Sequence, residues 1–183
     1  MLSQMYLLQF DGMLQTLTEH PQMGGFLGYG WLITRNGIEI AHGFGLFANK
    51  QTVNSNIAEY LALIEALEAS VDLRIRDEQI EIHGDSKCVI DQMAGKASVN
   101  SLSIRNLYQR AHRLAGKFKH LTWGWVPRHK NKLADSLSRR GLEHLYNQPG
   151  AYALAINRLD TKSGGRSGFI SMLDLRVYNP MPF

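Results

Sequence analysis

Short runs of apolar residues broken by turn-forming residues occupy the first 50 positions, which is the pattern of β-strands. Tyr6 to Phe10 is an apolar run that ends at Asp11-Gly12, so we expect a strand followed by a turn. Tyr29 to Ile33 and Ile38 to Phe47 flank Arg35-Asn36-Gly37. Asn-Gly between apolar stretches predicts a hairpin, because a type I′ turn needs positive φ at both central residues. Three antiparallel strands are therefore expected at the start, with a loop over Met13 to Phe26, where Pro and Gly-Gly interrupt the pattern.

The hydrophobic period changes near residue 56. From Ile57 to Val71 apolar residues recur at three- and four-residue spacing, which predicts a helix that Ser55 or Asn56 can cap. The remaining expected elements are a strand, two helices, a strand and a last helix capped by Asn131, over Gln79 to His83, Lys87 to Met93, Leu102 to Phe118, Leu121 to Val126 and Asn131 to Tyr146.

This order of elements predicts an α/β fold with one mixed five-stranded sheet and helices on both faces. The three antiparallel strands come first and parallel βα units follow. We place the main domain at residues 1–147 and a C-terminal extension of unknown role at residues 148–183, in which Phe169 to Val177 either adds a strand or packs on the surface. In open sheets of this kind ligands bind at the carboxyl ends of the strands, where Asp11 and Asp85 are expected.

Composition indicates an ordinary globular protein of 183 residues with 44% hydrophobic positions. No apolar run approaches the roughly 20 residues needed to cross a bilayer. Cys88 is the single cysteine, which excludes an intrachain disulfide and a thiolate zinc site, and we interpret it as a small buried side chain. The net charge of +4 suits a polyanionic partner. We expect a cytoplasmic monomer that does not bind membranes.

Four carboxylates are the candidate chemistry. Taken singly, Asp11 is a turn residue, Glu59 a helix surface residue, Asp85 a helix cap and Asp135 a first-turn aspartate. Two of them follow strands and two lie near helix N-termini, so all four are expected at one edge of the sheet. Such a group would repel strongly unless divalent cations neutralised it. Oxygen ligands suit Mg²⁺ or Mn²⁺, and two such ions about 4 Å apart promote in-line displacement at a phosphodiester.

Four segments in register resemble the motifs of type 1 ribonuclease H, in particular its short, reverse-transcriptase-like branch of bacteria and archaea: Gln9-Phe-Asp-Gly12, Ser55-Asn-Ile-Ala-Glu-Tyr60, Ile82-His-Gly-Asp-Ser86 and Val126-Pro-Arg-His-Lys-Asn-Lys-Leu-Ala-Asp135. The resemblance covers about residues 5 to 147. It implies a ribonuclease H-like fold and cleavage of the RNA strand of RNA–DNA hybrids, leaving 3′-hydroxyl and 5′-phosphate ends. It also implies two bound ions, held by Asp11, Glu59, Asp85 and Asp135.

The same resemblance assigns further roles. His129, in the loop before Asp135, is similar to a family histidine that moves a proton or helps the product metal leave, although loop histidines are often only solvated. The expected substrate contacts are Gly12, Ser55, Asn56, Ser86, Lys87 and Arg128.

The chain also departs from the family at positions that would contact the substrate. Met13 to Gly25 replaces a short glycine-rich turn, Ser55 replaces an asparagine, and Lys87 stands where glutamine is frequent. There is no room for the separate basic helix of many relatives. The expected helix over Leu102 to Phe118 and the residues just after it still carry basic side chains that either contact a nucleic-acid backbone or are simply solvated: Arg105, Arg110, His112, Arg113, Lys117 and Lys119.

Three aromatic or imidazole side chains near the expected site have competing interpretations. Trp123 and Trp125 could stack on nucleotides, but their alternation along a strand favours core packing. His83 lies two positions before Asp85, and we interpret it as a hydrogen-bonded core histidine.

Three functions therefore remain open. The first is a hybrid-directed endonuclease, the second a nuclease of the same fold acting on another nucleic-acid structure, and the third a binding protein that has lost catalysis.

Overall fold

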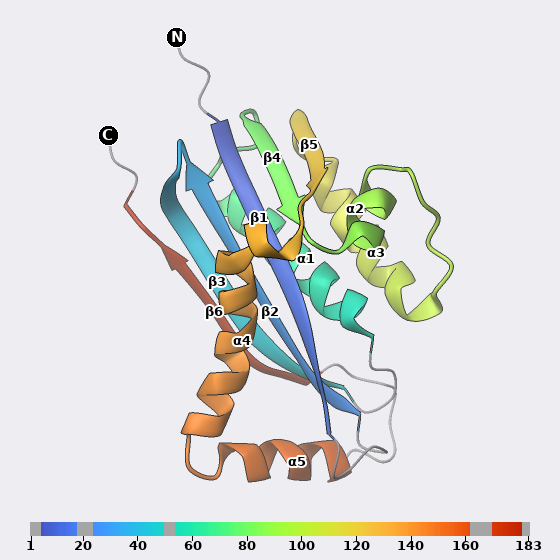
Figure 1. The fold of residues 1–183 in the computed structure, drawn as a ribbon, viewed down its shortest axis with the longest axis vertical. Helices are drawn as coiled ribbons and strands as arrows, with labels where there is room; N and C mark the ends of the chain where they lie inside the picture. The colour runs from blue at the N-terminus through green and yellow to red at the C-terminus, as the bar shows by residue number, and fades with distance from the viewer. Residues whose placement is uncertain (1–4, 18–23, 50–53, 162–169, 181–183) are drawn as a thin grey trace.

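The computed structural model of the protein describes residues 5–17, 24–49, 54–161 and 170–180. Its elements follow one another along the chain in this order (Figure 1): β1 (Met5–Thr16), β2 (Gly25–Arg35), β3 (Ile38–Asn49), α1 (Ser55–Asp72), β4 (Gln79–Gly84), α2 (Lys87–Met93), α3 (Leu102–Ala115), β5 (His120–Trp125), the 3₁₀ turn η2 (Arg128–Lys130), α4 (Lys132–Asn147), α5 (Ala151–Thr161) and β6 (Ile170–Tyr178). The predicted order of strands and helices is confirmed from β1 to α4.

The strands form one mixed sheet in the order β5-β4-β1-β2-β3-β6. β1, β2, β3 and β6 are antiparallel neighbours, whereas β4 is parallel to β1 and β5 is parallel to β4. The mixed sheet is as predicted, but it has a sixth strand, because the C-terminal segment adds β6 to the edge of β3. Of the two alternatives for that segment, the added strand is the one observed.

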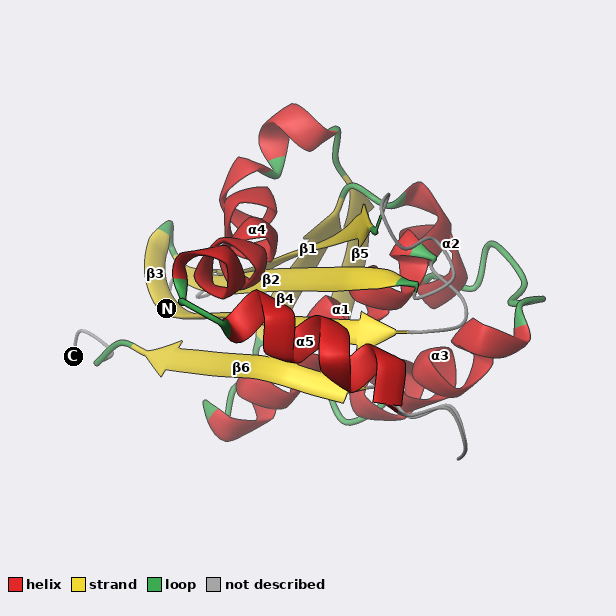
Figure 2. Ribbon diagram, turned by 90° about the horizontal axis from the view of Figure 1, so that it is seen from below, coloured by secondary structure: helices red, strands yellow, loops and turns green. Residues whose placement is uncertain are grey.

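Helices cover both faces of the sheet, as the order of elements predicted. Figure 2 shows α4 on one face and α1 with α3 on the other. The main core lies between the sheet and α1, α2 and α3, and it includes the fully buried side chains of Leu8, Phe10 and Tyr60. On the other face, α4 buries Leu137 against Leu32 of β2. Both α1 and α4 contact β1, one from each face of the sheet.

The first hairpin is longer than predicted. Asp11 and Gly12 are not in a turn but continue β1, and Met13–Thr16 pair with Gly25–Gly28 of β2. The prediction of a loop is therefore wrong for residues 13–16 and for Gly25 and Phe26, while residues 18–23 of that stretch lie outside the described residues. The strand continues because its apolar positions have partners: Leu14 packs on the main core, and Met13 packs on a second cluster that contains Leu17 and Phe26.

Asparagine residues occupy one hairpin turn and the N-cap positions of two helices. The Asn36-Gly37 turn has φ of 51° and 81°, as the hairpin prediction requires. Asn54, rather than Ser55 or Asn56, caps α1, since its side chain accepts a hydrogen bond from the Asn56 amide. Asn131 occupies the N-cap position of α4, but its side chain makes no capping hydrogen bond.

Three side chains expected in the core lie at the surface. Cys88 is exposed. Trp125 ends the edge strand β5 and is 50% exposed, whereas Trp123 packs against the main core as predicted. His83 is partly exposed beside Glu81 of the same strand, on the side of β4 opposite the buried Ile80 and Ile82. Among the described residues, no helix is long and apolar enough to span a membrane.

Candidate active site

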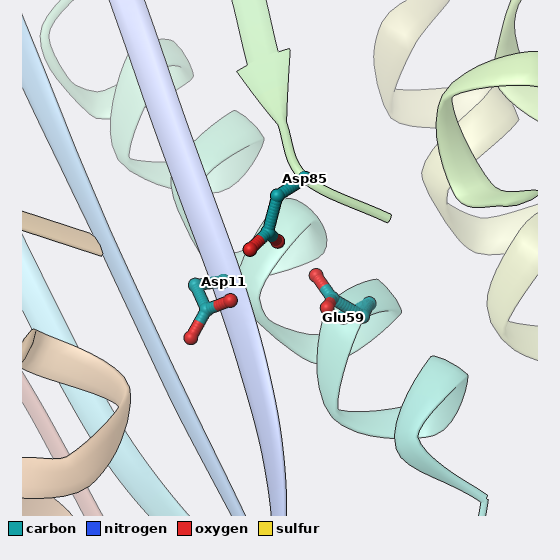
Figure 3. A group of neighbouring side chains, drawn as sticks. All are labelled: Asp11, Glu59 and Asp85. Carbon is teal, nitrogen blue, oxygen red and sulfur yellow. The ribbon is translucent and has the colours of Figure 1, made fainter. Parts of the chain in front are cut away.

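Three carboxylates from three elements meet at the carboxyl end of β4. Asp11 comes from the middle of β1, Glu59 from the second turn of α1, and Asp85 directly follows β4 (Figure 3). One oxygen atom of each side chain lies within 4.8 Å of an oxygen of the other two. Asp11 is 3% and Glu59 is 6% exposed, so two of the three charges are almost fully removed from water.

The end of β4 makes this meeting possible. β4 pairs with β1 only as far as Gly84, which lies opposite Phe10, so the next residues of β1 have no strand on that side. The first turns of α1 approach β1 at this point. A Cβ atom on Gly12 would lie 2.2 Å from the Glu59 backbone nitrogen. Glycine at position 12 therefore allows the backbone of α1 to come close enough for Glu59 to reach Asp11.

Helix α4 supports Asp11 from the opposite face through Ser138. The Ser138 hydroxyl is fully buried and lies 2.5 Å from Asp11 Oδ2, to which it donates a hydrogen bond; it also lies 2.8 Å from the Asp135 carbonyl. A Cβ on Gly30 would lie 2.3 Å from the Ser138 nitrogen, so the helix packs directly on the β2 backbone. Ser138 was not among the residues predicted from the sequence. Its position one turn after Asp135, on the same face of α4, was the available signal.

Asn131 is a second supporting residue that the sequence analysis assigned only to helix capping. Its side chain is fully buried, and its amide donates a 2.8 Å hydrogen bond to the carbonyl oxygen of Phe10. It also accepts a 3.4 Å hydrogen bond from Gln9. The start of α4 is thus tied to the two residues of β1 that precede Asp11.

Asp135, the fourth predicted carboxylate, lies outside the group of three. Its two oxygens are held by Arg139, at 3.1 and 3.2 Å, and by Arg128, which donates to Oδ1. Burial alone would raise the pKa of Asp135, but the hydrogen bonds from Arg139 and Arg128 outweigh it and lower the pKa. Arg139 is a cleft residue that the sequence analysis did not identify.

The electrostatics of the three clustered carboxylates favour cation binding. Burial and, to a smaller extent, the charges of Asp85 and Asp135 together raise the pKa of Asp11 to about 7, against the opposing hydrogen bond from Ser138. Burial, followed by the charges of Asp11 and Asp85, raises the pKa of Glu59 well above its usual value. Glu59 Oε2 is buried without a hydrogen-bond partner among the described residues. A buried, unpartnered carboxylate oxygen among like charges fits a divalent cation with oxygen ligands.

A cleft of about 540 Å³ opens onto these carboxylates. Its walls come from the free edge of β1, the start of α1, the Asp85-Ser86 turn and two arginines, with the lining Asp11, Gly12, Met13, Leu14, Gln15, Ser55, Asn56, Glu59, Asp85, Ser86, Arg128 and Arg139. Ser86 donates to Asn56 at 3.3 Å, which links the two sides of the cleft. Lys87 and His129 are not part of its lining. Lys87 is exposed and pairs with Asp91 at 2.5 Å, and His129 is exposed in η2.

Comparison with known families gives one matching sequence profile, described as reverse transcriptase-like, over residues 18–141. A curated relative, the bifunctional protein Rv2228c of Mycobacterium tuberculosis, is 33% identical over 105 residues, which is 56% of this chain but only 28% of that protein. Ribonuclease HI of Halobacterium salinarum is 36% identical over 115 residues, 62% of this chain and 55% of the relative. The chain therefore spans about a quarter to a half of the length of these relatives.

Solved structures with the same fold include the N-terminal RNase H domain of Rv2228c, with a TM-score of 0.66 and 27% identity over 84% of this chain and 99% of the other. The RNase H1 of Halobacterium salinarum has a TM-score of 0.66 and 32% identity, covering 76% of this chain and 98% of the other. LC11-RNase H1, solved in complex with an RNA/DNA hybrid, has a TM-score of 0.68 at 23% identity over 78% of this chain and 99% of the other, a similarity of fold.

Proposed function

From the premise that the chain belongs to the reverse transcriptase-like family of ribonuclease H-like proteins, we propose that it is a metal-dependent endonuclease that hydrolyses the RNA strand of RNA–DNA hybrids. The products would be 3′-hydroxyl and 5′-phosphate ends. The observation that carries this proposal is the meeting of Asp11, Glu59 and Asp85 within 4.8 Å beside an open cleft. The ribonuclease HI named above supports the choice of reaction.

Four carboxylates would hold the metal ions, and Ser138 would orient one of them. Asp11, Glu59, Asp85 and Asp135 would hold two Mg²⁺ or Mn²⁺ ions, which when bound supply an activated water and stabilise the leaving 3′ oxygen. Ser138 holds one oxygen of Asp11 and leaves the other facing the cluster. The carboxylates, rather than amides, are needed because their charge offsets that of the ions.

Binding of the substrate would fall to the rest of the cleft. Asn56 and Ser86, which are hydrogen-bonded to each other, present polar groups suited to sugar hydroxyls, together with Gly12 and Ser55. Arg128 would contact phosphate. Lys87 lies just outside the lining and would contact the nucleic-acid backbone further along, and His129 would move a proton at the reaction's end.

A cleavage assay tests the proposal. Wild-type protein with Mg²⁺ or Mn²⁺ should cut a labelled RNA–DNA hybrid, and chelation should stop the reaction. Asp11→Asn should lower the rate by about a thousandfold or more, because a cation contributes several kcal/mol to the transition state. Asp77→Asn, an exposed aspartate paired with Lys119 outside the cleft, is the matched control and should leave the rate unchanged. A wild-type protein that cuts no hybrid with either ion would refute the assignment.

The long first hairpin favours a second candidate, a nuclease that acts on another nucleic-acid structure. Met13, Leu14 and Gln15 line the cleft where β1 continues along the hairpin. These side chains lie where a substrate strand would pass, so they could change which duplex fits. A panel of single strands, duplex DNA, duplex RNA and hybrids at one salt concentration separates the two candidates, since the first predicts that the hybrid is cut fastest.

A further inference from the structure

The two arginines of the cleft are both engaged by one carboxylate. Among the described residues that line the cleft, Arg128 and Arg139 are the cationic ones, and both donate to Asp135. Among the described residues, the three clustered carboxylates make no ion pair with either arginine, although the charge of Arg128 opposes the rise in the pKa of Glu59. The cleft therefore contains three carboxylates without an ion pair and, beside them, one aspartate that pairs with both arginines.

Arg139 is the partner that closes Asp135 to other ligands. It lies one helical turn after Asp135 and contacts both carboxylate oxygens, with Nε at 3.1 Å from Oδ2 and a terminal nitrogen at 3.2 Å from Oδ1. Arg128 reaches only Oδ1. While Arg139 stays in this position, neither oxygen of Asp135 is free of a guanidinium group.

The ion pair between Arg139 and Asp135 is nevertheless weak enough for either residue to exchange its partner. The side chain of Arg139 is 48% exposed and that of Asp135 is 21% exposed, and ion pairs in such positions contribute at most about 1 kcal/mol. The guanidinium fork matches a phosphate as well as it matches a carboxylate. A phosphodiester that enters the cleft therefore competes directly with Asp135 for Arg139.

We propose that Arg139 is a substrate-binding residue that leaves Asp135 for a phosphate of the nucleic acid, so that substrate binding makes Asp135 available as a metal ligand. This deepens, and rests on, the proposed nuclease function. It divides the metal site into a part that is ready in the free protein, formed by Asp11, Glu59 and Asp85, and a part that the substrate completes. Arg139 thereby couples recognition of phosphate to assembly of the site.

Calorimetric titration with Mn²⁺ in the absence of nucleic acid tests the first half of this coupling. We expect one ion per chain for the wild-type protein, and a second binding event, or a second ion bound at least about fivefold more tightly, for Arg139→Gln. Arg140→Gln is the matched control, because Arg140 is the next residue of α4 and lies over the Phe44 ring, outside the cleft lining. It should titrate like the wild type.

Binding of a labelled RNA–DNA hybrid, with Ca²⁺ in place of Mg²⁺ and the strands shown intact afterwards, tests the second half. Arg139→Gln should bind about fivefold more weakly, and its plot of log affinity against log salt should be less steep by about one unit, as expected for one lost phosphate contact. Arg140→Gln should leave both values unchanged.

The inference is overturned if Arg139→Gln matches the wild type in both the Mn²⁺ titration and the salt dependence. It is also overturned if Arg140→Gln shifts both values as much. Neither readout requires turnover, so a protein that fails to cut hybrids but shows both shifts refutes the proposed reaction and leaves the role of Arg139 standing.

Discussion

At the scale of single residues, Glu59 opposes the stability of the metal-free protein. It is 6% exposed and its Oε2 has no hydrogen-bond partner among the described residues. Burial and the charges of Asp11 and Asp85 raise its pKa by more than the Gly12 backbone and the charge of Arg128 lower it. Burying a charged carboxylate among like charges costs free energy, which a bound divalent cation or a proton offsets. The same side chain is thus a cost in the absence of metal and a ligand in its presence.

Glu59→Gln should therefore stabilise the metal-free protein while removing its response to metal. The amide keeps the shape of the side chain, carries no charge and can donate to a neighbouring carboxylate. We expect urea unfolding in EDTA at neutral pH to show a gain of about 1 to 2 kcal/mol. Mg²⁺ should raise the unfolding midpoint of the wild type but not of the variant. A variant less stable than the wild type in EDTA would contradict this account of Glu59.

Asp11 gives the metal-free protein a pH dependence of defined sign. Its pKa is raised from 3.8 to about 7 in the folded state, so folded protein keeps a proton that the unfolded chain has already lost. The stability from this group is complete below about pH 4 and is lost as the pH rises towards 7, by at most about 4 kcal/mol. The raised pKa of Glu59 acts with the same sign.

The measurement is the free energy of unfolding in EDTA at intervals from pH 5 to pH 8. It should fall with rising pH for the wild type and fall less for Asp11→Asn. Glu68 and Asp135 have lowered pKa values, so their contributions change at more acidic pH, below this window. A wild-type stability that rises across the window would show that Asp11 ionises normally.

At the scale of elements, β6 is joined to α1 by an ion-pair network centred on Arg176. Its guanidinium group donates to Glu65, to Glu68 at 2.8 Å and to Asp72 at 3.5 Å, and these three residues lie on one side of α1. The side chains of Arg176 and Glu65 are 24% and 14% exposed. β6 therefore contacts two elements: it pairs with β3, and through Arg176 it also contacts α1, the helix that carries Glu59.

Arg176→Met should destabilise the protein by about 2 to 4 kcal/mol, because it leaves the largely buried Glu65 without its cation, whereas Glu68 keeps its ion pair with Arg110. Chemical unfolding at pH 7 measures the change. Lys119→Gln is the control: it breaks an ion pair with Asp77 in which both side chains are more than two-thirds exposed, and we expect no measurable change. Equal effects of the two substitutions would mean that the Arg176 network contributes no more than a surface pair.

The elements also show which parts of the fold the sequence could predict. Helix α2 runs from Lys87 to Met93 as predicted, and the Asn36-Gly37 turn forms as predicted, since period and turn chemistry are local properties. The continuation of β1 through Thr16 was missed because it depends on pairing with β2 and on the packing of Met13 and Leu14, which are long-range contacts. The surface position of Trp125 follows from the edge location of β5, which the period of the strand does not encode.

The same limit applies to the site. Asp85 directly follows β4 and Glu59 lies near the start of α1, so these two positions could be predicted from the sequence. Asp11 lies instead in the middle of β1, and it joins them because β4 ends beside it. The contact of Ser138 with Asp11 depends instead on how closely α4 packs on Gly30, and the pairing of Arg139 with Asp135 depends on a choice between partners. Neither of these two contacts can be predicted from the hydrophobic period or from the motif spacing.

At the scale of the whole molecule, the C-terminal extension is packed into the same fold as the site. β6 pairs with Ala41–Ala48 of β3, which would otherwise be an edge strand with unpaired backbone groups. Helix α5 buries Ala155, and the Tyr152 ring packs against Phe26 of β2. The residues of the cleft, by contrast, all come from positions 11 to 139.

Removing residues 148–183 should therefore separate stability from metal binding. We expect the shortened chain to unfold at a temperature lower by roughly 10 °C or more, since it loses a strand, the apolar contacts of α5 and the Arg176 network. It should also self-associate more readily through the free β3 edge. Mg²⁺ should still raise its unfolding midpoint, because Asp11, Glu59 and Asp85 remain. An unchanged midpoint would show that the extension adds nothing to the fold, and a lost Mg²⁺ response would show that β6 is needed to hold α1 and Glu59 in place.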